Sequence, residues 1–292
     1  MSVTISVTHV SDPGCPWAYS ASPHHAVLRW RYGAQLDWRL ALIGLAESGE
    51  NYDKRGYAPV SGARGYLKFR DYGMPFDTQP RERNIATGRA CRAVVAARLL
   101  DPAAELPAFR ALQLARFTTT TLFDTDDGIR AALAGVDGLD ADAIVAAIDA
   151  PATEEAYQAD RALVRTAAGS PTEFQGKAAN SDGAVRYTAP SLIFTHRDGR
   201  SLEAGGFQTV EAYDVIIANL DATLERRPPA EDVVEALGVL PFALTTREVA
   251  AMMAPHLVEP DERAAEEALI AAAATGAVRR ENVGGGALWR AA

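Results

Sequence analysis

Residues 3–18 read VTISVTHVSDPGCPWA, and they combine a strand pattern with the start of a helix. The alternating, β-branched run at 3–10 predicts a strand, and the Ser-Asp-Pro-Gly stretch at 11–14 predicts a turn. Proline suits the first position of a helix, because its fixed φ fits there and the N–H that it lacks would be unpaired anyway. Cys15 is therefore the predicted N-cap of a helix that begins at Pro16.

This predicted position of Cys15 makes it the candidate nucleophile of the chain. The free N–H groups of a first helical turn and the helix dipole stabilise a thiolate, so we expect the pKa of Cys15 to fall below about 8.5. A carboxylate at Asp12 would oppose this effect if it pointed toward the sulfur. The thiolate is the reactive form in thiol chemistry, so Cys15 is the predicted catalytic residue.

The elements around this stretch predict an α/β fold. The helical pattern continues from residue 16 to about residue 32, and a second alternating run at 35–43 completes a βαβ unit with parallel strands. Residues 45–83 are rich in Gly, Pro, Tyr and charge, which predicts a long loop. Helical periodicity from about residue 87 to residue 165 predicts a helical insertion.

The second half of the chain predicts a hairpin, a helix and a small terminal unit. Residues 187–195 form a β-rich run with one internal proline, and the His-Arg-Asp-Gly-Arg turn at 196–200 leads to a short partner strand. A helix is expected at about 209–225, followed by the Arg-Arg-Pro-Pro linker at 226–229. Residues 231–292 predict two helices and a hairpin, an order that resembles a winged-helix module.

The sequence resembles the DsbA-like family of the thioredoxin superfamily. Cys15, Pro16 and Trp17 match three positions of the family's Cys-Pro-Trp-Cys active site, and Ala18 stands at the fourth. Residues 188–194, TAPSLIF, match the cis-proline loop that faces this site in the family. The element order, with a helical insertion before the last hairpin and helix, also matches.

This resemblance implies a division of the chain. Residues 1–44 and 180–228 would form a thioredoxin-like core, residues 45–179 a loop plus helical insertion, and residues 230–292 a small C-terminal helical, winged-helix-like unit. It also implies a contact surface beside Cys15, made by Trp17 and by Ala189 and Pro190 of the cis-proline loop.

Ala18 changes the chemistry that the resemblance implies, because a Cys-X-X-Cys pair cannot form here. Three uses of one thiolate remain. It could form a mixed disulfide with a low-molecular-weight thiol of the glutathione or mycothiol kind, with no tightly bound cofactor. Cys91 could resolve such a disulfide. Cys15 could also serve non-redox chemistry, since the superfamily includes kappa-class glutathione transferases and 2-hydroxychromene-2-carboxylate isomerases beside FrnE-type oxidoreductases.

Three functions follow from these uses, and the residues leave all three open. The first is a DsbA-like thiol oxidoreductase with one active-site cysteine, acting on a small thiol or a protein thiol. The second is a thiol-dependent transferase or isomerase of an aromatic small molecule, with Tyr66, Phe69 and Tyr72 as a substrate wall. The third is a non-catalytic binding scaffold. Cys91 shares an apolar helical face with neighbouring valines, which also predicts a buried structural thiol.

The composition of the chain excludes several other classes of function. The net charge of −9 argues against nucleic-acid binding, and residues 231–292 carry ten acidic and five basic residues, so we expect a packing or dimerisation unit there. Two cysteines are too few for a disulfide scaffold or a structural zinc site, so no metal is expected. No membrane span and no signal peptide are predicted, which indicates a cytoplasmic protein.

Overall fold

The centre of the molecule is a four-stranded sheet, seen in a computed structural model that describes residues 4–180 and 183–292. The strand order is β2-β1-β5-β6, with β1 parallel to β2 and the other pairs antiparallel. The bounds are β1 Ile5–Ser11, β2 Leu36–Leu42, β5 Ser191–His196 and β6 Ser201–Ala204. The predicted βαβ unit and the hairpin are therefore confirmed, although Val3 of the first predicted strand lies outside the described residues.

Two predicted elements are interrupted by proline. The helix expected from residue 16 to residue 32 is two helices, α1 (Pro16–Ser20) and α2 (Ser22–Tyr32), which meet at Ala21. Pro23 lies in the first turn of α2, because a proline has no N–H to continue the ladder of α1. The β-rich run at 187–195 is likewise divided into β4 (Arg186–Tyr187) and β5, with Pro190 between them.

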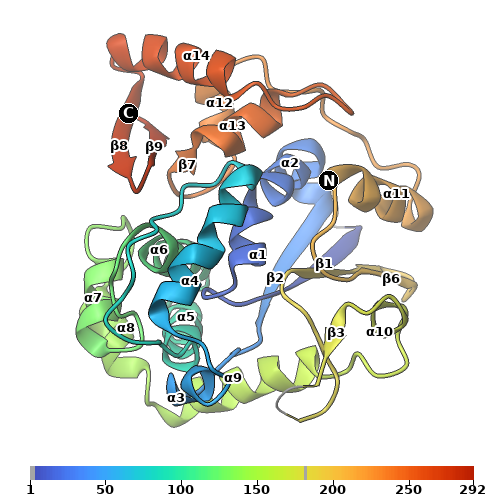
Figure 1. Cartoon of the computed structure of the whole chain (residues 1–292). Coiled ribbons are helices and arrows are strands. Elements are labelled where there is room, and N and C mark those ends of the chain that lie inside the picture. The colour runs from blue at the N-terminus through green and yellow to red at the C-terminus, as the bar shows by residue number, and fades with distance from the viewer. Residues whose placement is uncertain (1–3, 181–182) are drawn as a thin grey trace.

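Helices cover both faces of the sheet (Figure 1). On one face, α2 and α11 (Val210–Leu220) pack Leu28 and Ile217 against Val7 and Phe194 of the strands. On the other face, the insertion packs through α5 (Gly88–Leu100), whose Val94 belongs to the same buried cluster as strand residues of β2. The other helices of the predicted helical insertion are α6 Glu105–Thr118, α7 Asp126–Leu133, α8 Ala141–Ala147, α9 Pro151–Val164 and α10 Pro171–Phe174.

The loop predicted at 45–83 is wrong in part, because this segment contains short helices. They are α3 (Glu50–Asp53), α4 (Pro59–Gly65) and the 3-10 helix η2 (Tyr66–Tyr72). Tertiary packing stabilises them: aromatic side chains of the segment are buried with Tyr19 and Phe117 in one cluster. A short helix gains most of its stability from such packing, so local periodicity gives little signal for it.

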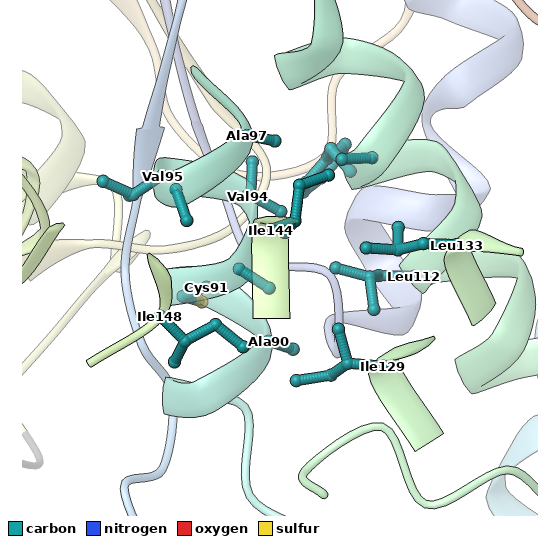
Figure 2. Close-up of a cluster of buried hydrophobic side chains, with 14 of the residues drawn as sticks. Ala90, Cys91, Val94, Val95, Ala97, Leu112, Ile129, Leu133, Ile144 and Ile148 are labelled. Atoms are coloured by element: carbon teal, nitrogen blue, oxygen red, sulfur yellow. The ribbon is translucent and has the colours of Figure 1, made fainter. Parts of the chain in front are cut away.

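Cys91 lies inside the core of the insertion. Figure 2 shows its sulfur on α5 among the side chains of Ala90, Val94 and Ile148. The Cys91 side chain has no exposed surface. The buried thiol that the apolar face of this helix predicts is thus confirmed.

The C-terminal unit contains the predicted helix pair and hairpin. Its elements are α12 Val233–Leu237, β7 Leu244–Thr245, α13 Thr246–Met253, α14 Glu262–Ala274, β8 Val278–Val283 and β9 Gly286–Ala291, with the strands in the order β7-β9-β8. The two helices and the hairpin lie where the sequence predicts them. The strand β7 was not predicted, since two residues carry no periodicity.

The linker at 226–229 suggested that this unit is separate from the core, but the unit packs directly on α2. Ala26, Val27 and Trp30 of α2 share one buried cluster with Val233, Val249 and Met252 of the unit. The linker itself is fixed, because Trp30 Nε1 donates to Pro228 O over 2.8 Å and Arg227 stacks on the Trp30 ring at 3.5 Å. The unit is therefore part of the folded body around α2, above the sheet in Figure 1.

Candidate active site

Cys15 is the N-cap of α1, directly after the turn that follows β1. Its N–H donates to Asp12 O over 3.1 Å, and Pro16 begins the helix. The backbone of Cys15 is extended, with φ −88° and ψ 114°, which is the usual N-cap conformation. The predicted N-cap is confirmed, but the thiol accepts no capping hydrogen bond.

The thiol instead faces the proline loop. Sγ of Cys15 donates to the carbonyl oxygen of Ala189 over 3.2 Å, and the peptide bond between Ala189 and Pro190 is cis. The structure therefore brings together the two motifs that stand 174 residues apart in the chain. Ala18 is buried in the same cluster as Cys15 and Ala189.

The expected drop in the pKa of Cys15 is wrong. Cys15 is only 6% exposed, and its burial raises the pKa of the thiol to about 12. The N–H groups of Trp17 and Ala18 and the guanidinium of Arg186 act in the opposite direction, but the loss of hydration outweighs them. The helix N-terminus is therefore present, yet the resting side chain is a neutral thiol.

Asp12 lies on the buried side of Cys15, and its charge adds to the rise in the thiol pKa. Its carboxylate accepts hydrogen bonds from the N–H groups of Gly14 and Leu45 at 2.8 Å each and from Thr87 Oγ1 at 3.0 Å. Asp12 thus joins the turn after β1, the segment after β2 and the start of α5. Burial raises the pKa of the Asp12 carboxyl itself.

Cys91 contacts the same carboxylate. Its Sγ donates to Asp12 Oδ2 over 3.5 Å, and burial raises the pKa of the Cys91 thiol well above its ordinary value. Both cysteines are free thiols. A resolving role for Cys91 stays a prediction, and it would require a change in the packing around Asp12.

The aromatic residues expected as a substrate wall separate into two groups. Tyr66 and Phe69 are buried in the aromatic cluster, whereas Tyr72 is half-buried. Trp17 is 37% exposed, and its ring packs edge-on against Phe69 at 4.8 Å and Tyr72 at 5.5 Å. The surface beside Cys15 is therefore aromatic. Of its three predicted members, Tyr66 and Phe69 are buried beneath this surface, and Tyr72 is partly exposed on it.

Sequence reasoning missed three residues of this site. Phe207 packs on Trp17 at 5.7 Å and on Tyr72 at 5.1 Å, and it completes the aromatic surface. Arg186 is the buried cation whose charge acts on Cys15, and Thr87 bonds Asp12. Phe207 follows a Gly-Gly pair at 205–206, which is a turn signal, whereas nothing local indicates Arg186 or Thr87.

Residues 4–180 and 183–292 contain no group of three or more His, Cys, Asp or Glu side chains placed to hold a metal ion. Within the same residues, none of the helices combines the length and the apolar character that a bilayer span requires.

Neither protein-family models nor curated proteins match this sequence. Solved structures do match the fold. A candidate protein disulfide isomerase from Nitrosomonas europaea aligns with a TM-score of 0.55 at 16% identity, over 74% of this chain and 97% of that chain. A probable DsbA oxidoreductase from Streptomyces coelicolor aligns with a TM-score of 0.54 at 16% identity, over 78% and 93%. The chain has a DsbA-like thioredoxin fold.

A third match is the cytosolic disulfide reductase DsbM from Pseudomonas aeruginosa, with a TM-score of 0.50 at 21% identity, over 75% of this chain and 98% of that chain. In each case about a quarter of the present chain lies outside the match, while nearly all of the other chain is covered. This DsbA-like fold places Cys15 after the first strand and the cis-proline loop opposite it.

Proposed function

We propose that this protein is a thiol–disulfide oxidoreductase that works through one thiol, Cys15. The contact from Cys15 Sγ to Ala189 O carries the proposal, because it sets the single thiol at a helix N-terminus against the loop that precedes a cis-proline. The solved structures of the same fold bear names of disulfide isomerases, oxidoreductases and reductases. A cytoplasmic location is part of the proposal, since DsbM is named as a cytosolic protein.

The proposed reaction has two exchange steps. Cys15 loses its proton to water, and the thiolate attacks one sulfur of a low-molecular-weight disulfide, RSSR. The S–S bond of RSSR breaks, a mixed disulfide Cys15–S–S–R forms, and RS⁻ leaves and takes up a proton. A second small thiol, as its thiolate R′S⁻, then attacks the sulfur of R, which restores the Cys15 thiol and forms R–S–S–R′.

The raised pKa favours the reducing direction for this exchange. A thiolate of high pKa is a poor leaving group. We therefore expect the mixed disulfide on Cys15 to be stable and Cys15 to be a weak oxidant of other thiols. Strong oxidants of this superfamily work in the opposite way, because their reduced thiolate is stabilised. Ala18 supplies no second sulfur and Cys91 is buried against Asp12, so the proposal assigns release of the mixed disulfide to an external thiol.

The test is mixed-disulfide formation with glutathione disulfide, followed by intact-mass and peptide mass spectrometry at pH 7 and pH 9. We expect one adduct, on Cys15, which forms faster at pH 9 and is removed by excess reduced glutathione. Cys15→Ser should form none. Cys91→Ser is the matched control and should keep the adduct. An adduct on Cys91 alone would contradict the proposed role of Cys15.

A binding scaffold is the second candidate, and the burial of the neutral thiol specifically favours it. In a scaffold, the aromatic surface of Trp17, Tyr72 and Phe207 would bind a partner and Cys15 would only fill space. Absence of any adduct at both pH values, in protein that is folded and has two free thiols, would establish this reading over the oxidoreductase.

A further inference from the structure

A small cavity with a mainly apolar lining and several buried nitrogen-bearing side chains lies where the sheet, the insertion and the C-terminal unit meet. Its volume is about 40 Å³, room for about three water molecules or one small ion. His9 of β1, Trp38 of β2, Arg110 of α6 and Glu248 of α13 all line it, together with His25 and Arg29 of α2. We refer to it as the His9–Arg110 cavity.

The nitrogen atoms of these residues are poorly satisfied. Within residues 4–180 and 183–292, no hydrogen-bond partner is found for His9 Nε2, His25 Nε2, Trp38 Nε1, or Nε and Nη1 of Arg110. His9, His25 and Arg110 are more than nine-tenths buried. A buried polar atom without a partner costs about 1–3 kcal/mol, and these five atoms belong to residues that line one cavity, which favours a bound species there.

The chemistry of these atoms favours an acceptor of hydrogen bonds. The indole nitrogen of Trp38 and the guanidinium nitrogens of Arg110 can only donate, and each imidazole donates in one of its tautomers. Glu248 Oε2 already accepts from Arg110 Nη2 at 2.7 Å and from the N–H and Oγ1 of Thr245 at 2.8 and 3.0 Å.

The residues around the cavity carry an excess of positive charge, which suits an anionic ligand. The charge of Arg110 is balanced by Glu248. Arg29 lies over the Trp38 ring at 4.2 Å and has no carboxylate within ion-pair distance among the described residues. Glu105, the acid whose charge acts on Arg29, is paired with Arg98 at 3.0 Å. One positive charge is therefore left over.

The two histidines do not add to this charge at neutral pH. Their rings are in edge contact with a centroid distance of 4.5 Å. Burial lowers the pKa of His9 to about 3 and that of His25 well below its ordinary value. Both rings are therefore neutral, and the single excess charge near the cavity is that of a guanidinium.

We propose that the His9–Arg110 cavity binds one small monovalent anion, with chloride as the probe. The anion would accept from Trp38 Nε1, Arg110 and the imidazoles, and it would neutralise the charge of Arg29. Since the ligands come from the sheet, α6 and the α2 helix that supports the C-terminal unit, binding stabilises the assembled body over the unfolded chain.

The test follows the unfolding midpoint temperature of the full chain while sodium chloride replaces sodium gluconate at constant ionic strength. Gluconate is too large for a 40 Å³ cavity. We expect a saturable rise with chloride in the wild type. Trp38→Phe removes one donor but keeps a ring beneath Arg29, so it should raise the half-saturating chloride concentration about ten-fold or more.

Trp30→Phe is the matched control, because Trp30 also carries a stacked arginine and donates its N–H elsewhere, to Pro228 O. It should keep the half-saturation of the wild type, whatever its effect on the midpoint temperature. A flat response to chloride in the wild type, or equal half-saturation in wild type and Trp38→Phe, would overturn the proposal in favour of water alone.

Crystals of the wild type soaked in bromide give a second readout that does not depend on a variant folding. An anomalous peak inside the cavity, within hydrogen-bonding reach of Trp38 Nε1, supports the proposal. A cavity that holds only water after the soak overturns it.

Discussion

Replacing Glu248 with glutamine should lower the free energy of unfolding by about 3 kcal/mol or more. Glu248 and Arg110 are 1% and 3% exposed and form an ion pair of 2.7 Å between α13 and α6. Glutamine is almost the same size and can still accept from Thr245. The variant therefore keeps the shape of the side chain but leaves the buried guanidinium of Arg110 without a counter-charge. An unpaired buried charge is strongly destabilising.

Glu262→Gln is the matched control, measured in the same urea titration. Its carboxylate is 41% exposed and pairs with Arg247 at 3.2 Å in the same C-terminal unit. An exposed pair contributes about 0–1 kcal/mol, so this variant should be close to the wild type. The double variant Arg110→Met/Glu248→Met should recover most of the loss, because it removes both charges together. Equal stabilities for Glu248→Gln and Glu262→Gln would show that the pair does not join the C-terminal unit to the insertion.

The parts of the site that the sequence predicts are those set by local backbone rules. Pro16 fixes the start of α1, and this alone makes Cys15 the N-cap. The cis-proline loop could be predicted only from the resemblance, because an X–Pro bond is cis in about 5–6% of cases in folded proteins. Its contact with Cys15 follows once β5 pairs with β1.

The parts that the sequence did not predict depend on distant packing. The thiol of Cys15 is buried by Val164, Tyr187 and Ala189, which lie far along the chain, so its hydration could not be judged from the motif. The short helices after residue 45 are stabilised by Tyr19 and Phe117 rather than by their own periodicity. The His9–Arg110 cavity is lined by residues of five elements that are distant in the chain, so no local pattern indicates it.

Alkylation of Cys15 by iodoacetamide at pH 7 should be at least about 50-fold slower in the folded protein than in urea. Burial raises the thiol pKa from 9.0 to about 12, which leaves about a thousandfold fewer thiolates. Each remaining thiolate is more nucleophilic, and this offsets about twenty-fold of the loss. Steric protection of a sulfur in a side chain that is only 6% exposed adds to the difference. Peptide mass spectrometry separates Cys15 from Cys91 and gives both rates in one experiment.

The pH dependence of Cys15 alkylation distinguishes a reducing thiol from an oxidising one. In the folded protein, the rate at Cys15 should rise ten-fold per pH unit from pH 7 to pH 10 without a plateau, whereas the unfolded chain should level off above about pH 9. A plateau below pH 8 in folded protein would mean that the helix N-terminus and Arg186 outweigh burial after all. The thiolate would then be a good leaving group, and the proposed exchange would run in the oxidising direction. The absence of a plateau leaves a reducing thiol, whose mixed disulfide is the stable state that an external thiol must release.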